Sequence, residues 1–158
     1  MRTALWIAAA VFVGIYVAFA FATVDRSPDQ AQINALIARG VEATQSRDLT
    51  TMVSCISPNY KDNALNYDQL RMVLAQALKN VEPYTVSISD QTCEINGNEA
   101  TVKLHVRLRH TSGGTFFDRR MTLKLAKEDD RHMLIAPVKT WKVVGSENLG
   151  LGMTQIEI

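Results

Sequence analysis

The feature that most constrains this chain is an uncharged, apolar run near its amino terminus. The run extends from Thr3 to Val24, between Arg2 and Asp25. A helix rises about 1.5 Å per residue, so this run is long enough to cross a hydrocarbon core of roughly 30 Å. It predicts a single N-terminal transmembrane helix, assigned here to residues 1–25.

The rival interpretation of the same run is a secretory signal. Signal peptides have a shorter apolar stretch, of about 7–15 residues, and a small-x-small cleavage site. The tripeptides Ala18-Phe19-Ala20 and Ala20-Phe21-Ala22 fit that site. The length of the run favours an uncleaved anchor, and a secreted domain released at Ala20 or Ala22 remains the alternative.

The charges beside the run predict its orientation. The amino terminus and Arg2 are positive, whereas Asp25, Arg26 and Asp29 give no positive excess on the other side. The positive-inside tendency then predicts a short cytoplasmic N-terminus and a single-pass protein of the inner (cell) membrane. The domain that follows would lie on the periplasmic, extracytoplasmic side.

Small residues in the run predict a contact with other membrane helices. Ala10 and Gly14 would let a second helix approach closely. A membrane partner would then be held by the span as well as by the domain.

Residues 26–146 show the pattern of an α+β domain. Helical spacing of apolar residues predicts a first helix over 29–46, a short second helix capped by Asp48, and a third that begins at Asn66 and stops at Pro83. These helices precede the strands, which is the order of a domain with helices on one face of a sheet.

After residue 84 the apolar period changes from 3.6 to 2, which predicts an antiparallel meander of about four strands. A parity shift indicates a bulge near Asp90, and Asn96-Gly97-Asn98 is typical of a hairpin turn. A second turn is predicted at Glu128-Asp129-Asp130 and a last strand over 132–144. Residues 147–158 are predicted to be an extended apolar tail that contacts a partner or, alternatively, packs on its own domain.

The order of these elements resembles the nuclear transport factor 2-like (cystatin-like, SnoaL-like) superfamily over residues 29–144. The resemblance depends on the long first helix, the short helix at Asp48-Leu49, the segment from Ser57 to Asp62, and the curved sheet. It implies a helices-then-curved-antiparallel-sheet cone whose mouth can hold a small ligand. Enzymes of the superfamily, such as ketosteroid isomerase-like proteins, place an acid and a general base deep in the cone.

The resemblance further implies that Tyr60 and Asp62 lie where a pocket could open. Tyr60 could donate to an oxyanion and Asp62 could accept a proton. The structural alternative is that Tyr60 is a core residue with a bonded hydroxyl and Asp62 caps a turn. The sequence favours this alternative, because no second carboxylate can be placed inward on a strand.

The charge distribution points to one side of the sheet. Residues 25–100 hold six basic and ten acidic side chains, whereas residues 101–142 hold ten basic and four acidic ones. Period-2 spacing and the neighbouring strand gather five of these basic residues, together with His105, on one face. We call them the basic stripe: Lys103, His105, Arg107, Arg109, Arg120 and Lys124.

The basic stripe has two interpretations. It is predicted to dock on an acidic protein surface or on anionic headgroups; alternatively it is an ordinary solvated face with Glu94 or Asp118 as cross-strand partners. A homodimer through this face is not favoured, because like charges would meet across the two-fold axis. Nucleic acid is not an expected partner, because no aromatic stacking platform accompanies the stripe.

The cysteines and histidines indicate little special chemistry. Cys55 and Cys93 could form one disulfide in an oxidising compartment, or they could be two separate buried thiols. His105, His110 and His132 show no pattern of convergence, so neither a metal site nor a cofactor is expected.

These features together predict a non-catalytic, single-span accessory or assembly subunit of a larger inner-membrane complex, either energy-transducing (respiratory or photosynthetic) or secretory. Its exported domain would be an interaction module. The alternative from another class is a small-ligand-binding or isomerase-like protein that uses the cone pocket.

Overall fold

A computed structural model describes residues 2–79, 82–132 and 136–148, with side chains for all of them except 2–10, 131 and 132. The chain divides into two compact units. The first consists of Met1–Pro28 and Glu128–Thr140, and the second of Asp29–Lys127 and Trp141–Ile158. We call the second unit the cone domain.

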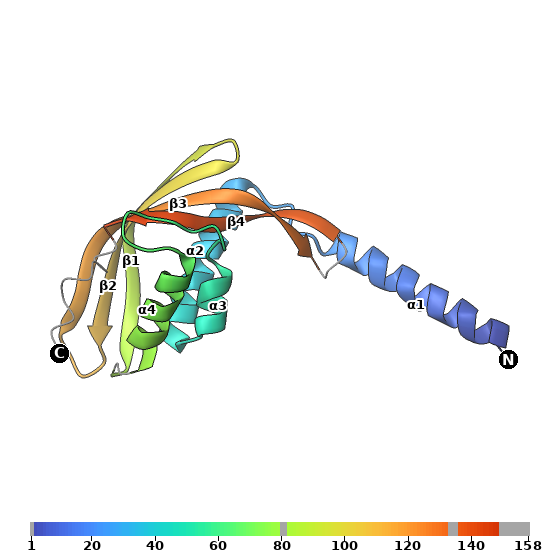
Figure 1. The fold of residues 1–158 in the computed structure, drawn as a ribbon, viewed down its shortest axis with the longest axis horizontal. Coiled ribbons are helices and arrows are strands. Elements are labelled where there is room, and N and C mark those ends of the chain that lie inside the picture. The colour runs from blue at the N-terminus through green and yellow to red at the C-terminus, as the bar shows by residue number, and fades with distance from the viewer. Residues whose placement is uncertain (1, 80–81, 133–135, 149–158) are drawn as a thin grey trace. The chain divides into compact units, whose positions relative to one another are not determined.

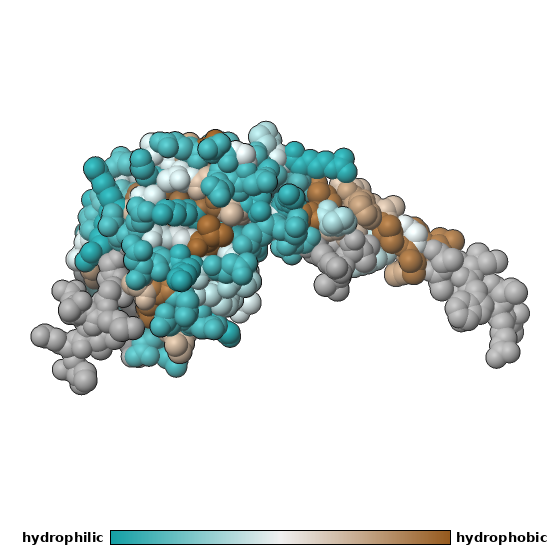
Figure 2. Space-filling model, turned by 45° about the horizontal axis from the view of Figure 1, so that its top comes forward, coloured by the Kyte–Doolittle hydropathy of each residue, from teal (hydrophilic) through white to brown (hydrophobic). Residues whose placement is uncertain are grey.

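The first unit contains one long helix, α1, over Arg2–Ala22 (Figure 1). Thr23 ends it by donating its hydroxyl to the carbonyl of Phe19 at 2.9 Å. Ala20 is fully buried, whereas Phe12 is 76% exposed. In the space-filling view apolar side chains prevail along the described part of α1 (Figure 2).

Among the residues described with their side chains, no helix is both long enough and apolar enough to span a membrane. The side chain of Ala10 lies outside that description, and an added Cβ at Gly14 would contact nothing within 4 Å. The transmembrane helix and its contact residues stay predictions.

The cone domain begins with three helices, and their bounds follow from local capping. They are α2 over Asp29–Ser46, α3 over Leu49–Ser54 and α4 over Tyr67–Lys79. Asp48 caps α3 by accepting from the Thr51 N–H at 3.1 Å, which confirms the predicted cap. Asn66 and Gln69 cap α4 reciprocally, each side chain accepting from the other residue's N–H at 3.0 Å.

The strands form one antiparallel meander in the order β1-β2-β3-β4. Their bounds are Tyr84–Asn96 for β1, Glu99–His110 for β2, Thr115–His132 for β3 and Ala136–Glu147 for β4. The predicted bulge is confirmed: the β1–β2 register shifts between Ser89 and Thr92, and Asp90 has a φ of 53°. Gly97, with a φ of 60°, completes the predicted hairpin turn.

Two details of the sheet differ from the sequence prediction. The turn predicted at Glu128-Asp129-Asp130 was wrong, because β3 continues through these residues to His132. The last strand runs beyond the predicted residue 144 to Glu147. Of the predicted tail at 147–158, residues 149–158 lie outside the described residues.

The α+β class and the order of helices before a curved antiparallel sheet are confirmed. Figure 1 shows α2, α3 and α4 together on the concave side of the sheet. One part of the core joins Ile33 of α2 to Val102, Leu125 and Trp141 of the sheet. Elsewhere the helices and the sheet do not close on each other, and the candidate site lies there.

Candidate ligand-binding site

A cavity of about 240 Å³ lies between the three helices and the concave face of the sheet. The helices and the segment that follows α3 contribute aliphatic and methionine side chains: Leu36, Ile37, Val41, Met52, Ile56, Leu70 and Leu74. The sheet contributes a second apolar set: Val86, Ile88, Leu104, Val106, Leu108, Met121, Leu123 and Val143. No charged side chain is found among the described residues that line it.

Many of these apolar side chains are only half-buried. Met121 and Leu123 on β3, and Val106 and Leu108 on β2, all keep partial exposure although they point into the cone. Apolar surface left accessible in this way has a favourable free energy of transfer onto any apolar group that covers it. The cone is therefore an open apolar pocket, not a filled core.

The polar end of the cavity is assembled by pairing between the segment after α3 and strand β4. The Ser57 N–H donates to the Val143 carbonyl at 2.9 Å, and the Lys61 N–H donates to the Val144 carbonyl at 3.0 Å. Gly145 permits this approach, because an added Cβ would lie 3.1 Å from the Lys61 carbonyl oxygen. The pairing brings Tyr60 next to Ser146, which is 86 residues away in the sequence.

Three oxygen atoms meet at this end. The Tyr60 hydroxyl donates to Asp62 Oδ2 at 2.6 Å and lies 2.7 Å from Ser146 Oγ. Ser146 Oγ lies 3.1 Å from the same Asp62 oxygen. The other oxygen, Asp62 Oδ1, accepts from the N–H groups of Ala64 at 2.8 Å and Leu65 at 2.6 Å.

Their ionisation states follow from these contacts. Burial raises the pKa of Tyr60, and the hydrogen bond to Asp62 raises it further, so the phenol is neutral. Partial burial raises the pKa of Asp62. The hydrogen bonds that it accepts from Tyr60, Ala64, Leu65 and Ser146 outweigh that effect, so the net shift lowers the pKa and the group is a carboxylate at neutral pH.

The two predicted pocket residues do not face the same space. Tyr60 lines the apolar cavity, Asp62 lines a separate polar pocket beside Lys61 and Lys124, and Ser146 borders both. Tyr60 is 2% exposed and its hydroxyl is bonded, and Asp62 caps the turn that follows it. This geometry matches the structural alternative for the pair, since no carboxylate among the described lining residues points into the cone.

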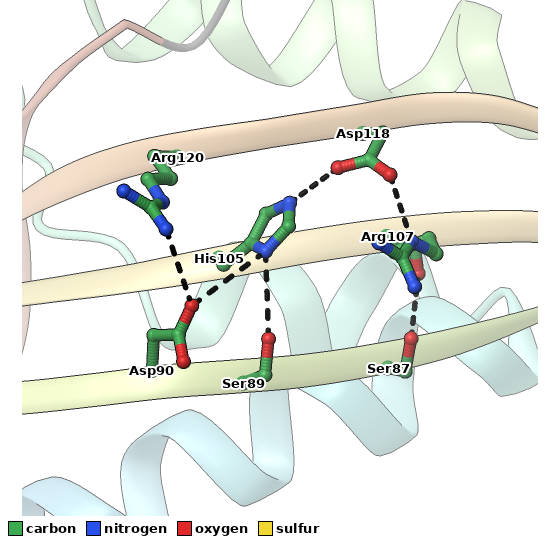
Figure 3. A network of polar contacts seen from close by, with 7 residues as sticks. All are labelled: Ser87, Ser89, Asp90, His105, Arg107, Asp118 and Arg120. Atoms are coloured by element: carbon green, nitrogen blue, oxygen red, sulfur yellow. Dashed lines mark hydrogen bonds and ion pairs between the residues drawn. The ribbon is translucent and has the colours of Figure 1, made fainter.

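The basic stripe lies on the opposite face of the sheet, as the register shows. His105 on β2 is opposite Arg120 on β3, and Arg107 is opposite Asp118. Figure 3 shows Asp118 between His105 and Arg107, and Asp90 between His105 and Arg120. Asp118 pairs with His105 and with Arg107 Nε, the latter at 2.7 Å, and its pKa is lowered by the bonds from Arg107 and then His105.

Other members of the stripe are also paired. Asp90, at the bulge, lies 3.6 Å from Arg120 Nη2 and 3.9 Å from His105 Nδ1. Lys124 Nζ lies 2.7 Å from Glu147 Oε1. Four of the six stripe residues thus have an acidic partner within the chain. In Figure 2, hydrophilic residues, coloured teal, cover most of the visible surface of the cone domain.

The cysteines are two free thiols, so no disulfide joins Cys55 to Cys93. Cys55 lines the cavity at the end of α3, while Cys93 packs from β1 against the cluster around Ile33. Burial raises the pKa of Cys55, which makes its thiol a neutral, weak donor.

Of the lining residues, the sequence singled out Tyr60 for a pocket; the small and polar residues Gly40 and Thr44 on α2 and Ser146 on β4 were not proposed for one. For Ser146 the sequence carried no signal, because the inward residues Trp141 and Val143 alternate with period 2 and Ser146 falls on the other parity. For the other two, helical spacing placed Gly40 and Thr44 on the inward face of the helix, but spacing alone does not show that the space beneath them is empty.

No family model matches the chain, and no curated protein matches it. Solved structures do. An NTF2-like protein with a cystatin-like fold from Novosphingobium aromaticivorans matches with a TM-score of 0.60 at 18% identity, covering 75% of this chain and 79% of that one. An NTF2-like protein of unknown function from Pseudomonas putida KT2440 matches with a TM-score of 0.60 at 14% identity, covering 73% and 82%.

A candidate ketosteroid isomerase from Shewanella frigidimarina NCIMB 400 matches with a TM-score of 0.51 at 14% identity, covering 73% of this chain and 92% of that one. The cone domain has an NTF2-like, cystatin-like fold. At these identities the similarity establishes the fold alone.

Proposed function

We propose that the cone domain is a non-catalytic binding module that takes one small, mainly apolar ligand into its cavity, and that α1 tethers it to a membrane. The observation that carries the proposal is the open cavity of about 240 Å³ with its almost wholly apolar lining. A cavity of about 150 Å³ accommodates benzene, and pockets for drug-sized ligands begin near 300 Å³. The ligand is therefore of one or two rings, or a chain of similar bulk.

The lining argues against an isomerase-like reaction in this cone. Such chemistry needs a base at the substrate and donors aimed at the developing oxyanion. The Asp62 carboxylate faces another pocket, and the Tyr60 hydroxyl hydrogen is already given to it. Binding needs neither group to be free.

Methyl NMR of the full chain in phosphatidylcholine nanodiscs tests this proposal. The two-ring hydrocarbon decalin is the probe, and the reporters are the methyl groups of Met52 and Met121, which line the cavity from α3 and β3. Met72 on α4 is 65% exposed and serves as the internal control. Saturable shifts at Met52 and Met121 without one at Met72 support the proposal, and equal or absent shifts contradict it.

A second candidate function is favoured by the surface of α1: an accessory subunit that packs on other helices of an inner-membrane complex. Phe12, Ile15 and Phe19 are all more than half exposed along the helix. Such apolar side chains are stable only against lipid or protein. Gentle detergent extraction followed by sizing tests this function. Co-migration with other subunits that is lost on Gly14→Leu supports it, and migration as a monomer contradicts it.

A further inference from the structure

The hydroxyl groups that line the cavity already donate hydrogen bonds to other groups of the protein. Thr44 Oγ1 donates along its own helix to the Gly40 carbonyl at 2.7 Å. The Tyr60 hydroxyl donates to Asp62 Oδ2 at 2.6 Å. Ser146 completes the set of lining hydroxyls among the described residues.

The number of hydroxyl hydrogens limits which groups Ser146 can donate to. The triangle of Tyr60 Oη, Ser146 Oγ and Asp62 Oδ2 has three close contacts, of 2.6, 2.7 and 3.1 Å. Each hydroxyl supplies one hydrogen and the ionised carboxylate supplies none, so only two contacts can be hydrogen bonds at one time. Because Tyr60 gives its hydrogen to Asp62, the Ser146 hydrogen turns to Tyr60 Oη or to Asp62 Oδ2.

Both arrangements leave the same surface toward the cavity. The hydrogens point inside the triangle, and the unused lone pairs of Ser146 Oγ remain as acceptors. Ser146 borders both the apolar cavity and the neighbouring polar pocket, so these acceptors are within reach of a ligand in the cavity. A ligand carbonyl at this end would find no hydrogen unless Ser146 broke a bond that it already makes. A ligand hydroxyl could donate to Ser146 Oγ without disturbing the cluster.

We propose that the cavity selects an otherwise apolar ligand that carries one hydroxyl group, bound with its O–H donating to Ser146 Oγ, over the corresponding ketone. This inference depends on the proposed function, since it concerns the ligand of the same cavity. The acceptor is fixed in place because Ser146 is only 7% exposed and its Oγ contacts Tyr60 Oη and Asp62 Oδ2. The ligand is thus an apolar alcohol or phenol of one or two rings.

The test compares 2-decalol, 2-decalone and decalin, three probes of one shape, on the full chain in phosphatidylcholine nanodiscs. Affinities are read from the Met52 and Met121 methyl shifts for the wild type and for Ser146→Ala. Each probe partitions into the lipid equally for both proteins, so the ratio between proteins isolates the hydroxyl of Ser146. Thr44→Val is the matched control, since it removes the other aliphatic hydroxyl of the lining.

We expect the affinity for 2-decalol to fall about fivefold in Ser146→Ala, the typical effect of one neutral hydrogen bond. The affinities for decalin and 2-decalone should not change, and Thr44→Val should leave all three as they were. Loss of 2-decalone affinity in Ser146→Ala, or loss of 2-decalol affinity in Thr44→Val alone, would overturn the inference.

The outcomes separate this inference from the proposed function. If all three probes bind the wild type and Ser146→Ala equally, the selection for a hydroxyl is wrong and the binding module stands. If none shifts Met52 or Met121 in the wild type, the binding module itself is wrong. Should Ser146→Ala fail to fold, a nuclear Overhauser contact between the carbinol proton of 2-decalol and the Ser146 β-protons in the wild type replaces it: its presence supports the pose and its absence overturns it.

Discussion

On β2, Lys103 and Leu104 are neighbours that point to opposite faces of one sheet. The concave face, at Leu104, is apolar and left partly uncovered above the cavity. The convex face, around Lys103, is charged, and most of its cations are paired by carboxylates of the same chain. The contrast shows that a dense run of charges can be neutralised by partners within the same chain. A partly exposed apolar face, in contrast, still gains favourable free energy when a ligand covers it.

The largest expected effect comes from truncating each neighbour in turn. Leu104 is 3% exposed in the main core cluster, so Leu104→Ala should lower the free energy of unfolding by about 2–4 kcal/mol. Lys103→Ala should change it by less than about 0.5 kcal/mol, because it removes a solvated side chain. Urea denaturation of the full chain checks both values, and similar losses for the two variants would remove the contrast between the faces.

The next effect concerns the polar end of the concave face. Tyr60→Phe removes a hydrogen bond to a charged group and should cost about 1–3 kcal/mol. The folded-state pKa of Asp62 is lowered, so its contribution is present above the unfolded pKa of about 4 and is lost as pH falls through the folded value.

The loss of stability below about pH 4 should therefore be shallower in Tyr60→Phe than in the wild type. Unfolding free energies measured from pH 2 to 7 give the comparison. A pH profile that keeps the wild-type slope would show that Tyr60 does not hold the Asp62 carboxylate.

Much of the fold was predictable from the sequence because local rules dominate it. The caps at Asp48 and Asn66 place the helix starts within a residue, and the parity shift near Asp90 marks the bulge. The turn at Glu128-Asp129-Asp130 was mispredicted from composition, since three acidic residues in a row suit a turn but are also tolerated on an exposed strand.

The site was less predictable, since it depends on contacts between distant segments. Tyr60 and Asp62 were picked out, but their separation into two pockets depends on the pairing of the segment around Lys61 with Val144. The basic stripe was correctly placed on one face, yet its pairing with Asp90 required the bulge geometry that turns this side chain toward Arg120.

A smaller effect is expected at Gly40, which lies within α2 above the cavity. An added Cβ meets nothing within 4 Å, so Gly40→Ala should gain helix propensity without a clash. The free energy of unfolding should rise by about 0.5–1 kcal/mol. A lower melting temperature for Gly40→Ala than for the wild type would mean that the space beside Gly40 is occupied.

The smallest effect on stability is expected on the convex face. Asp118→Asn should leave the free energy of unfolding almost unchanged, because Asp118 and its partner Arg107 are both solvent-exposed. It removes the carboxylate that pairs with Arg107 and one of the two carboxylates beside His105, so adhesion of the full chain to phosphatidylserine vesicles should increase and should weaken again with salt. Glu94→Gln on β1 removes the same charge and is the matched control; equal adhesion of both variants would show that pairing does not mask the stripe.

The central claim, that the cone is an open binding cavity, is tested most directly by filling it from within. Gly40→Leu places an isobutyl group into the space, and Gly40→Ala is the matched control for helix propensity. We predict that decalin shifts the Met52 and Met121 methyls in the wild type and in Gly40→Ala but not in Gly40→Leu, which remains folded. Unchanged binding of decalin by a folded Gly40→Leu protein would contradict the account.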